Sequence, residues 1–461
     1  MAMRQNNQVE LNLGTGAKGE TPRAAARETE ALAANADPER PAAMLGPSME
    51  AVVERENLRK ALAQVKRNHG AAGVDGMSVD DLSAHLREHW PTIRAQLLEG
   101  TYQPQPVRRV EIPKASGGTR LLGIPTVLER FIQQAVMQVL QVDWDPTFSE
   151  ASFGFRPGRS AHQAVKRAQE YIASGHGIVV DIDLEKFFDR VNHDILMGLV
   201  AKRVSDKRIL KLIRGFLTAG VLVDGLVGPT EEGTPQGGPL SPLLSNLMLD
   251  VLDKELEKRG HRFVRYADDC NIYVRSRQAG ERVMASIEGF LTRRLKLKVN
   301  TAKSAVARPS VRKFLGFSFT SGKQPRRRIA PQAIDRFKAR VRELTRRTGG
   351  RSLAQVAKEL SRYLIGWRGY FGFCETPTVL RELDRWIRRR LRAIAWAQWK
   401  HGPNRFAELR RRGVGRDLAA KTASSPRGPW RLSKSPALSI ALRNAFLTSL
   451  GLATLEPRCV A

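Results

Sequence analysis

The chain has 461 residues, and its 77 Lys and Arg against 46 Asp and Glu give a formal net charge of +31 at pH 7. A single hydrophobic core stops growing at about 250 to 300 residues, so this length predicts at least two domains. So large a basic excess predicts a polyanionic partner, and nucleic acid is favoured over a solvated basic surface or a membrane surface. The three scattered cysteines argue against a disulfide framework or a zinc site and fit a reducing cytoplasm, and no apolar run has transmembrane length.

The first part of the chain divides into two segments of different composition. The composition of residues 1–48 predicts a disordered leader. The segment has few large apolar side chains among many Ala, Glu, Arg, Gly and Asn, so it cannot bury enough apolar surface to fold. From Met49 onward apolar residues recur at helical spacing, and the stretch after the turn Gly73–Gly76 carries His85 and His89 four residues apart. That spacing can serve a metal ion, but no third ligand accompanies the pair, so a structural role is favoured.

Between about residues 107 and 319 helical stretches alternate with short β-branched runs, a mixture that predicts an α+β domain. The strand-like runs are Gly177–Ile182, Phe263–Tyr266 and Asn271–Arg275.

The character changes after about Gln324. From Arg326 to Arg416 the sequence is compatible with helices and holds 25 Lys and Arg against 7 Asp and Glu, with Tyr, Phe and Trp interleaved. Basic helices with aromatic residues indicate contact with RNA. Most of these aromatics are nevertheless expected in the core of a helical bundle.

Two adjacent acids, Asp268 and Asp269, lie between two strand-like halves, so a tight hairpin would present them at its tip. Nucleotidyl transfer uses two divalent ions about 4 Å apart, which hard oxygen ligands must hold. An adjacent acid pair is also common in an ordinary solvated turn, and the two residues alone leave that interpretation open.

A second pair, Asp181 and Asp183, follows an apolar run, and both carboxylates belong to one face of the predicted strand. A buried strand that ends in acids is suited to a cation, although a strand end that simply reaches solvent has the same pattern. The glycine and proline turn Gly233–Pro242 precedes a helix-like run. Such a turn allows the backbone to approach a nucleotide closely, or it is an ordinary loop before a helix.

The ordered set of these motifs resembles the reverse transcriptases encoded by bacterial group II introns. Tyr266–Asp269 is similar to the signature hairpin of that family, Asp183 with Phe188 five residues on resembles its first metal-binding motif, and Gly233–Pro242 resembles its template and nucleotide motif. The resemblance implies that Asp183, Asp268 and Asp269 are catalytic and hold two Mg²⁺ ions, with Asp181 the less favoured member of its pair.

The resemblance also implies roles for residues around these acids, beginning with Ile112–Pro125, which is similar to the fingers motif of the family. Phe188 would reject a ribose 2′-hydroxyl. The implied deoxynucleotide contacts are Lys114, Arg120, Phe188, Gln236 and Lys303. The implied template and primer contacts are Arg156, Gly237, Phe314 and Gly316. The implied RNA contacts are Trp367, Tyr370, Arg388, Arg389 and Arg390.

The predicted fold is therefore an α+β right-hand polymerase followed by an α-helical thumb and maturase domain. The basic stretch around Gly366–Phe371 resembles that domain, and no His-rich, Cys-paired nuclease module follows it, which implies that the protein does not cut its second target strand. The expected organisation is a leader (1–48), fingers and palm (49–323), thumb and maturase domain (324–440) and a C-terminal tail (441–461).

The predicted function is RNA-directed DNA polymerisation by a group II intron protein that also binds its intron RNA, assists splicing, and copies the intron into DNA during retrohoming. Its partners would be intron RNA, a DNA target or primer and deoxynucleoside triphosphates in the bacterial cytoplasm or nucleoid, without a membrane. Two alternatives stay open: a host-domesticated or defence-type reverse transcriptase, and a maturase that only assists splicing.

Overall fold

The computed structural model describes residues 46–113, 119–223, 226–228, 232–234, 237–347 and 350–456. The chain forms two compact units. Within the described ranges, the first unit covers residues 46–160, 182–270 and 281–305, and the second covers residues 161–181, 271–280 and 306–456. None of the described helices is long and apolar enough to cross a membrane.

Helices make up most of the first unit, and side chains cap several of them. The Thr126 hydroxyl accepts from the Glu129 amide at the start of α4, and the Asn192 side chain does the same for the Ile195 amide at α6. The helices are α1 (Met49–Val52), α2 (Arg55–Asn68), α3 (Leu82–Glu99), α4 (Val127–Trp144), α6 (His193–Ala201), α7 (Lys207–Thr218) and α8 (Ser241–Lys258).

Two four-stranded sheets carry the α+β character that the sequence predicts. The first has the order β2-β1-β4-β5, with β1 (Val107–Pro113), β2 (Thr119–Ile124), β4 (Val221–Val223) and β5 (Leu226–Gly228). The second has the order β6-β7-β3-β8, with β3 (Ile178–Ile182), β6 (Arg262–Tyr266), β7 (Asp269–Val274) and β8 (Ala305–Ala307). α9 (Arg277–Phe290) follows β7. The strands β3, β6 and β7 lie where the β-branched runs predict them.

The second unit begins with α5 (Ala161–Ala173), which the expected boundary at residue 323 assigns to the palm. Its hydrogen bonds explain the grouping: the Gln169 amide donates to the Pro325 carbonyl at 2.7 Å and to the Glu375 carboxylate at 2.8 Å. The antiparallel strands β9 (Phe317–Phe319) and β10 (Arg327–Ile329) lead into the helices of this unit.

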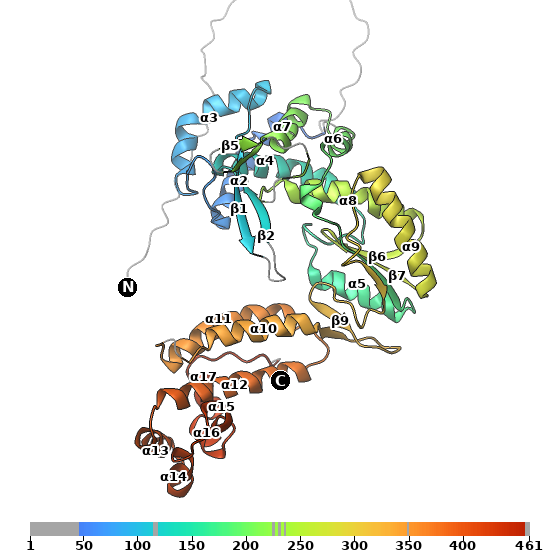
Figure 1. Ribbon diagram of the computed structural model, residues 1–461. Coiled ribbons are helices and arrows are strands. Elements are labelled where there is room, and N and C mark those ends of the chain that lie inside the picture. Colours follow the sequence, from blue (N-terminus) through green and yellow to red (C-terminus); the bar gives the residue numbers. More distant parts are fainter. Residues whose placement is uncertain are drawn as a thin grey trace, which may run out of the picture. The chain divides into compact units, whose positions relative to one another are not determined.

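Long helices form the core of the second unit, and Figure 1 shows α10 (Pro331–Leu344), α11 (Leu353–Phe371) and α12 (Thr378–Gln398) packed together. A second, smaller core surrounds Trp396 and Leu438. The helices around it are α13 (Gly402–Arg411), α14 (Arg416–Ala423), α15 (Pro429–Leu432) and α16 (Pro436–Ala441).

The last described residues differ from the expectation of a separate tail after residue 440. Leu447 in α17 (Asn444–Ser449), Leu452 and Leu455 are buried in the same core as α10, α11 and α12. The Asp384 carboxylate on α12 accepts hydrogen bonds from the Leu455 amide at 3.1 Å and the Glu456 amide at 3.3 Å. This segment is therefore part of the helical domain.

Candidate functional site

The adjacent acids Asp268 and Asp269 lie at the turn between β6 and β7, as the sequence predicts. Asp268 is partly buried, and Asp269 is exposed. Ala267 before them has φ +55°, the left-handed conformation that residues other than glycine seldom adopt. Gly154 lies so close to this turn that a Cβ atom there would be 2.2 Å from the Ala267 nitrogen. The turn therefore requires glycine at position 154.

Asp183 follows directly after β3, the strand next to β7 in the sheet, and the segment around residue 300 holds its backbone. Its amide donates to the Ser304 hydroxyl at 3.0 Å, and its carbonyl accepts from the Asn300 amide at 2.8 Å. Lys303 Nζ lies 3.8 Å from Asp183 Oδ2, and that lysine side chain is 67% exposed. Lys303 is thus next to a predicted catalytic acid and accessible to a ligand.

Asp181, the less favoured acid of its pair, has a cation partner within the chain. Arg312 Nε lies 2.9 Å and Nη2 lies 2.5 Å from its Oδ2. A carboxylate paired in this way by a guanidinium is less available to a metal ion.

The residues fit Mg²⁺ by their chemistry, since carboxylate oxygens are the hard ligands that this ion prefers. Asp183 is one-third exposed, Asp268 is partly buried and Asp269 is exposed, so a ligand can reach all three. Across the described ranges, no group of three or more His, Cys, Asp or Glu side chains has the geometry to hold a metal ion. Joint binding of Mg²⁺ by the three aspartates stays a prediction.

Phe188 lies in the short 3₁₀ helix Phe187–Asp189, where the buried Phe187 packs edge to face against it at 5.2 Å between ring centroids. The Phe188 carbonyl accepts from the Thr234 amide at 2.6 Å. Gly233 has φ +96°, and a Cβ atom there would be 2.9 Å from that same carbonyl oxygen. The turn after Asp183 and the start of the glycine and proline segment are therefore joined by their backbones.

His193 adds a side-chain contact to this junction that the sequence did not suggest. It is buried at the start of α6, and its Nε2 lies 2.6 Å from the Gly233 carbonyl oxygen. A carbonyl can only accept, so Nε2 carries the proton and donates.

The remaining nucleotide contacts fall mainly outside the described residues. Lys114 and Gln236 belong to the undescribed segments, as does the side chain of Arg120, whose backbone pairs with Ile112 in the β1–β2 ladder. Gly237 has φ +147°, and a Cβ atom there would be 2.7 Å from the Gly123 carbonyl of β2.

Arg156, predicted to contact template or primer, has its donors occupied within the chain. Its side chain is 3% exposed and lies 2.8 Å from the Asp145 carboxylate. Nη1 donates to the carbonyls of Ser149 and Ser152, and the guanidinium lies over the Phe148 ring. These are the contacts of a residue that supports the fold, and they give the prediction no support.

Phe155 is the residue near the hairpin that sequence analysis overlooked. It has φ +59°, and the residue is 46% exposed, although Gly154 and Arg156 on either side are buried. Strained backbone conformations cluster at functional sites, which makes Phe155 a candidate ligand contact. In the sequence Phe155 lies between Gly154 and Arg156, and nothing in that pattern indicates its exposure.

The predicted primer residues Phe314 and Gly316 form a tight turn in which the amides and carbonyls of Phe314 and Phe317 pair at 2.8 and 2.9 Å. The Tyr370 hydroxyl donates to the Leu315 carbonyl at 2.8 Å, and a Cβ atom at Gly316 would be 3.0 Å from the Phe371 ring. α11 therefore supports this turn directly.

The predicted RNA contacts on α11 and α12 also have partners inside the unit. Trp367 is buried and packs on Phe337 at 4.3 Å. Arg388 lies 3.6 Å from Asp384. Arg389 lies over the Trp430 ring at 3.6 Å, and Arg390 donates to the Thr345 hydroxyl at 2.6 Å. RNA binding by these side chains stays a prediction.

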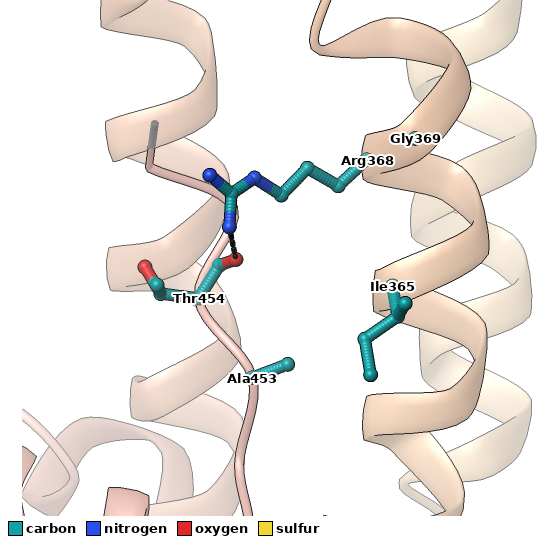
Figure 2. Close-up of a pocket in the computed structure, with 5 residues that line it drawn as sticks. All are labelled: Ile365, Arg368, Gly369, Ala453 and Thr454. Carbon is teal, nitrogen blue, oxygen red and sulfur yellow. Dashed lines mark hydrogen bonds between the residues drawn. The ribbon is translucent and has the colours of Figure 1, made fainter. Parts of the chain in front are cut away.

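Figure 2 shows a pocket of about 400 Å³ between α11 and the C-terminal segment of the same unit. Arg368 extends across it, and its Nη1 donates to the Thr454 carbonyl at 3.4 Å. Ile365, Gly369 and Ala453 complete the lining. No residue of the predicted site lines this pocket.

Comparison with known families gives two matches in chain order. Residues 112–319 match the family described as reverse transcriptase (RNA-dependent DNA polymerase). Residues 334–413 match the group II intron, maturase-specific domain. Asp183, Asp268 and Asp269 lie within the first match, and α11 and α12 lie within the second.

Individual proteins of known sequence are similar to parts of the chain. Protein YkfC of Escherichia coli K12 is 34% identical over 272 residues, 51% of this chain and 71% of the relative. The group II intron-encoded protein LtrA of Lactococcus lactis subsp. cremoris is 40% identical over 188 residues, 41% of this chain and 31% of LtrA. A putative COX1/OXI3 intron 2 protein of Saccharomyces cerevisiae is 37% identical over 196 residues, 42% of this chain but 22% of that protein. The chain thus spans most of YkfC and under a third of the intron-encoded relatives.

Proposed function

Since the chain belongs to the family of group II intron-encoded reverse transcriptases, we propose that it copies RNA into DNA and also binds the intron RNA that encodes it. The observation that carries the polymerase proposal is the position of Asp268 and Asp269 at the β6–β7 turn inside the reverse transcriptase match. Asp183, at the end of the neighbouring strand β3, is the third acid of the site.

Two Mg²⁺ ions held by these aspartates would lower the pKa of the attacking 3′-hydroxyl and neutralise the leaving pyrophosphate. The chain's own residues orient the reactants. Lys303, beside Asp183, would bind the nucleotide phosphates together with Lys114 and Arg120. Phe188, held by the buried Phe187, would exclude a ribose 2′-hydroxyl, and Gln236 would lie beside the incoming deoxynucleotide.

The second role is contact with structured RNA. Its support is the maturase-specific match at residues 334–413 and the excess of 25 Lys and Arg over 7 Asp and Glu between Arg326 and Arg416. Contacts to phosphates dominate the binding of such folded RNA. Bound in this way, the protein would stabilise the intron for splicing, and the same particle would use a DNA target as primer in the bacterial cytoplasm or nucleoid.

The polymerase proposal is tested by incorporation of deoxynucleotides on poly(rA) with an oligo(dT) primer in Mg²⁺. The double variant Asp268→Ala/Asp269→Ala should lose synthesis and keep its affinity for intron RNA within about 2-fold, because removing carboxylates does not remove phosphate contacts. A charge-matched control is Asp80→Ala/Asp143→Ala, which removes two exposed acids elsewhere in the first unit and should stay active.

The alternatives give different outcomes in the same assays. Folded wild-type protein that binds intron RNA but incorporates no deoxynucleotide would favour a maturase that only assists splicing. Robust synthesis with no preference for intron RNA over unrelated RNA would favour a domesticated or defence-type enzyme. Equal loss of synthesis and RNA binding in the Asp268 and Asp269 variant would contradict the separation of the two roles.

A further inference from the structure

Arg265, directly before the Tyr266–Asp269 turn, is fully buried in β6, with 0% exposure. Its guanidinium pairs with Asp253 of α8, also 0% exposed, which accepts from Nε at 2.8 Å and from Nη2 at 2.5 Å. Removing two charges from water costs free energy that their mutual attraction often only offsets. Fold stability alone is a weak reason for such a pair, because apolar side chains of similar volume often serve as well.

The third nitrogen of Arg265 contacts the turn itself. Nη1 donates to the Ala267 carbonyl at 2.9 Å and to the Asn246 side-chain oxygen at 3.0 Å. Ala267 is the residue with φ +55°, and its carbonyl carbon is bonded to the nitrogen of Asp268. The buried guanidinium therefore fixes the peptide group that joins the strained residue to the first acid.

Asn246 connects this contact to the opposite side of the turn. Its Nδ2 donates to the Gly154 carbonyl at 2.9 Å, and Gly154 is the residue whose missing Cβ leaves room for the Ala267 amide. Backbone bonds complete the frame: the Arg265 amide donates to the Ala151 carbonyl and the Phe153 amide to the Arg265 carbonyl, both at 2.9 Å. The turn is thus fixed by contacts from α8, β6 and residues 151–154.

We infer that Arg265 is a positioning residue, which acts through the Ala267 carbonyl to hold the turn in the conformation that presents Asp268 and Asp269. Asp253 orients the guanidinium, and Asn246 links it to Gly154. The effect of Arg265 on DNA synthesis rests on the proposed polymerase function, whereas its effect on the conformation of the turn does not. A planar fork with fixed donor directions suits this task, which the single ammonium of lysine cannot perform.

The first test is Arg265→Lys, which keeps the buried positive charge and loses the fork. We expect kcat for deoxynucleotide incorporation to fall about 10- to 100-fold, since small misplacements of reacting groups cost rates of this order. The Mg²⁺ concentration for half-maximal rate should rise, and the KM for template and primer should stay near that of wild type. Arg259→Lys is the matched control, because it changes an exposed arginine that pairs with Glu255 on α8.

A second variant separates positioning from stability. Arg265→Met/Asp253→Leu removes both charges and should keep most of the thermal stability, as apolar replacement of a buried pair often does. If Arg265 positions the turn, this variant stays folded, but its kcat for deoxynucleotide incorporation remains low. Recovery of both stability and kcat would overturn the inference. If either protein is strongly destabilised, Asn246→Ala is the substitute, because it leaves the ion pair intact and removes its link to Gly154. This variant is expected to lower kcat while its melting temperature stays close to that of wild type.

Amide hydrogen exchange provides a measurement that does not need activity. In Arg265→Lys the peptide covering residues 262–270 should exchange faster, while peptides of α11 and α12 should be unchanged. This result with an inactive wild type would mean that the polymerase proposal fails and the positioning of the turn holds. Unchanged exchange at the turn together with wild-type kcat would overturn the inference and leave the polymerase proposal intact.

Discussion

Arginine side chains in this basic chain serve the fold as well as any polyanionic partner. Arg156 and Arg265 are buried, and each pairs with a carboxylate and with backbone carbonyls close to the β6–β7 turn. A net charge of +31 suggests that arginines face a ligand, but it cannot distinguish these residues from exposed ones. Burial and hydrogen bonds make the distinction, and they move Arg156 from the expected ligand contacts to the supporting structure.

Phe155 shows the opposite situation, in which a strained residue presents an aromatic side chain to solvent. We expect Phe155→Asn to weaken the affinity for a template and primer duplex by about 3- to 10-fold, the equivalent of one lost stacking contact. Because Asn adopts positive φ more readily than Phe, thermal stability should stay the same or rise slightly. Equilibrium binding and thermal unfolding of the two proteins check this prediction. A loss of stability with unchanged binding would mean that the ring packs for structure.

At the scale of elements, the strands could be predicted and the contacts between them could not. The β-branched runs at 177–182, 263–266 and 271–275 correspond to β3, β6 and β7, because strand propensity and the bounding turns are local properties. The position of Asp268 and Asp269 at a hairpin turn followed from that pattern. The supports of this turn come from α8 and residues 151–154, and the sequence of the hairpin itself does not indicate them.

The polar residues of α8, however, form a pattern that can be recognised in the sequence. Asn246, Asp250 and Asp253 recur at helical spacing on the buried face of α8, and buried polar residues at such spacing require partners. The C-terminal end of the helical domain left no comparable trace. α17 has only six residues, too few to show helical periodicity, so its burial in the core depended on tertiary contacts.

Glu129 joins the segment before β1 to the start of α4, and its ionisation should make this junction depend on pH. The residue is 1% exposed, its carboxyl group accepts from the Gln105 amide, and burial raises the pKa of that group to about 7. A raised pKa means that the folded protein favours the protonated form. The stabilising contribution is complete below the ordinary pKa near 4.5 and is lost as pH rises through about 7.

The test is Glu129→Gln, which keeps the size and the hydrogen-bonding capacity without a charge. Its free energy of unfolding should match wild type near pH 5 and exceed it at pH 8.5 by on the order of 2 kcal/mol. Denaturant unfolding at both values measures the difference. A difference that does not change with pH would show that Glu129 is not the group that titrates.

At the scale of the whole molecule, the two compact units and the two family matches correspond only in part. The reverse transcriptase match at 112–319 contributes residues 161–181, 271–280 and 306–319 to the second unit, which also contains the maturase match at 334–413. Hydrogen bonds such as Gln169 to Glu375 account for this grouping. Sequence motifs follow the order of the chain, whereas compactness follows contacts, and so the unit boundary could not be predicted from composition.

The second unit carries exposed arginines on the helices of the maturase-specific match. Arg362 on α11 and Arg385 on α12 are exposed, whereas Arg389 lies on the Trp430 ring and donates to the Trp430 carbonyl. If exposed arginines contact phosphates, Arg362→Gln/Arg385→Gln should weaken binding to intron RNA. The slope of log K against log salt concentration should also become shallower by about 1 to 2. Each phosphate contact releases counterions when it forms, so a variant with fewer contacts releases fewer counterions on binding.

Arg389→Gln is the control variant for this experiment, because it changes an arginine that packs against Trp430. Loss of its contacts with Trp430 should lower the melting temperature of the protein and leave the salt slope near that of wild type. The reverse pattern, with a reduced slope for Arg389→Gln and an unchanged slope for the double variant, would assign RNA binding to the segment Arg388–Arg390 that the sequence predicts. Because the slope counts phosphate contacts and the melting temperature reports packing, the two measurements together separate arginines that bind RNA from arginines that hold the helices.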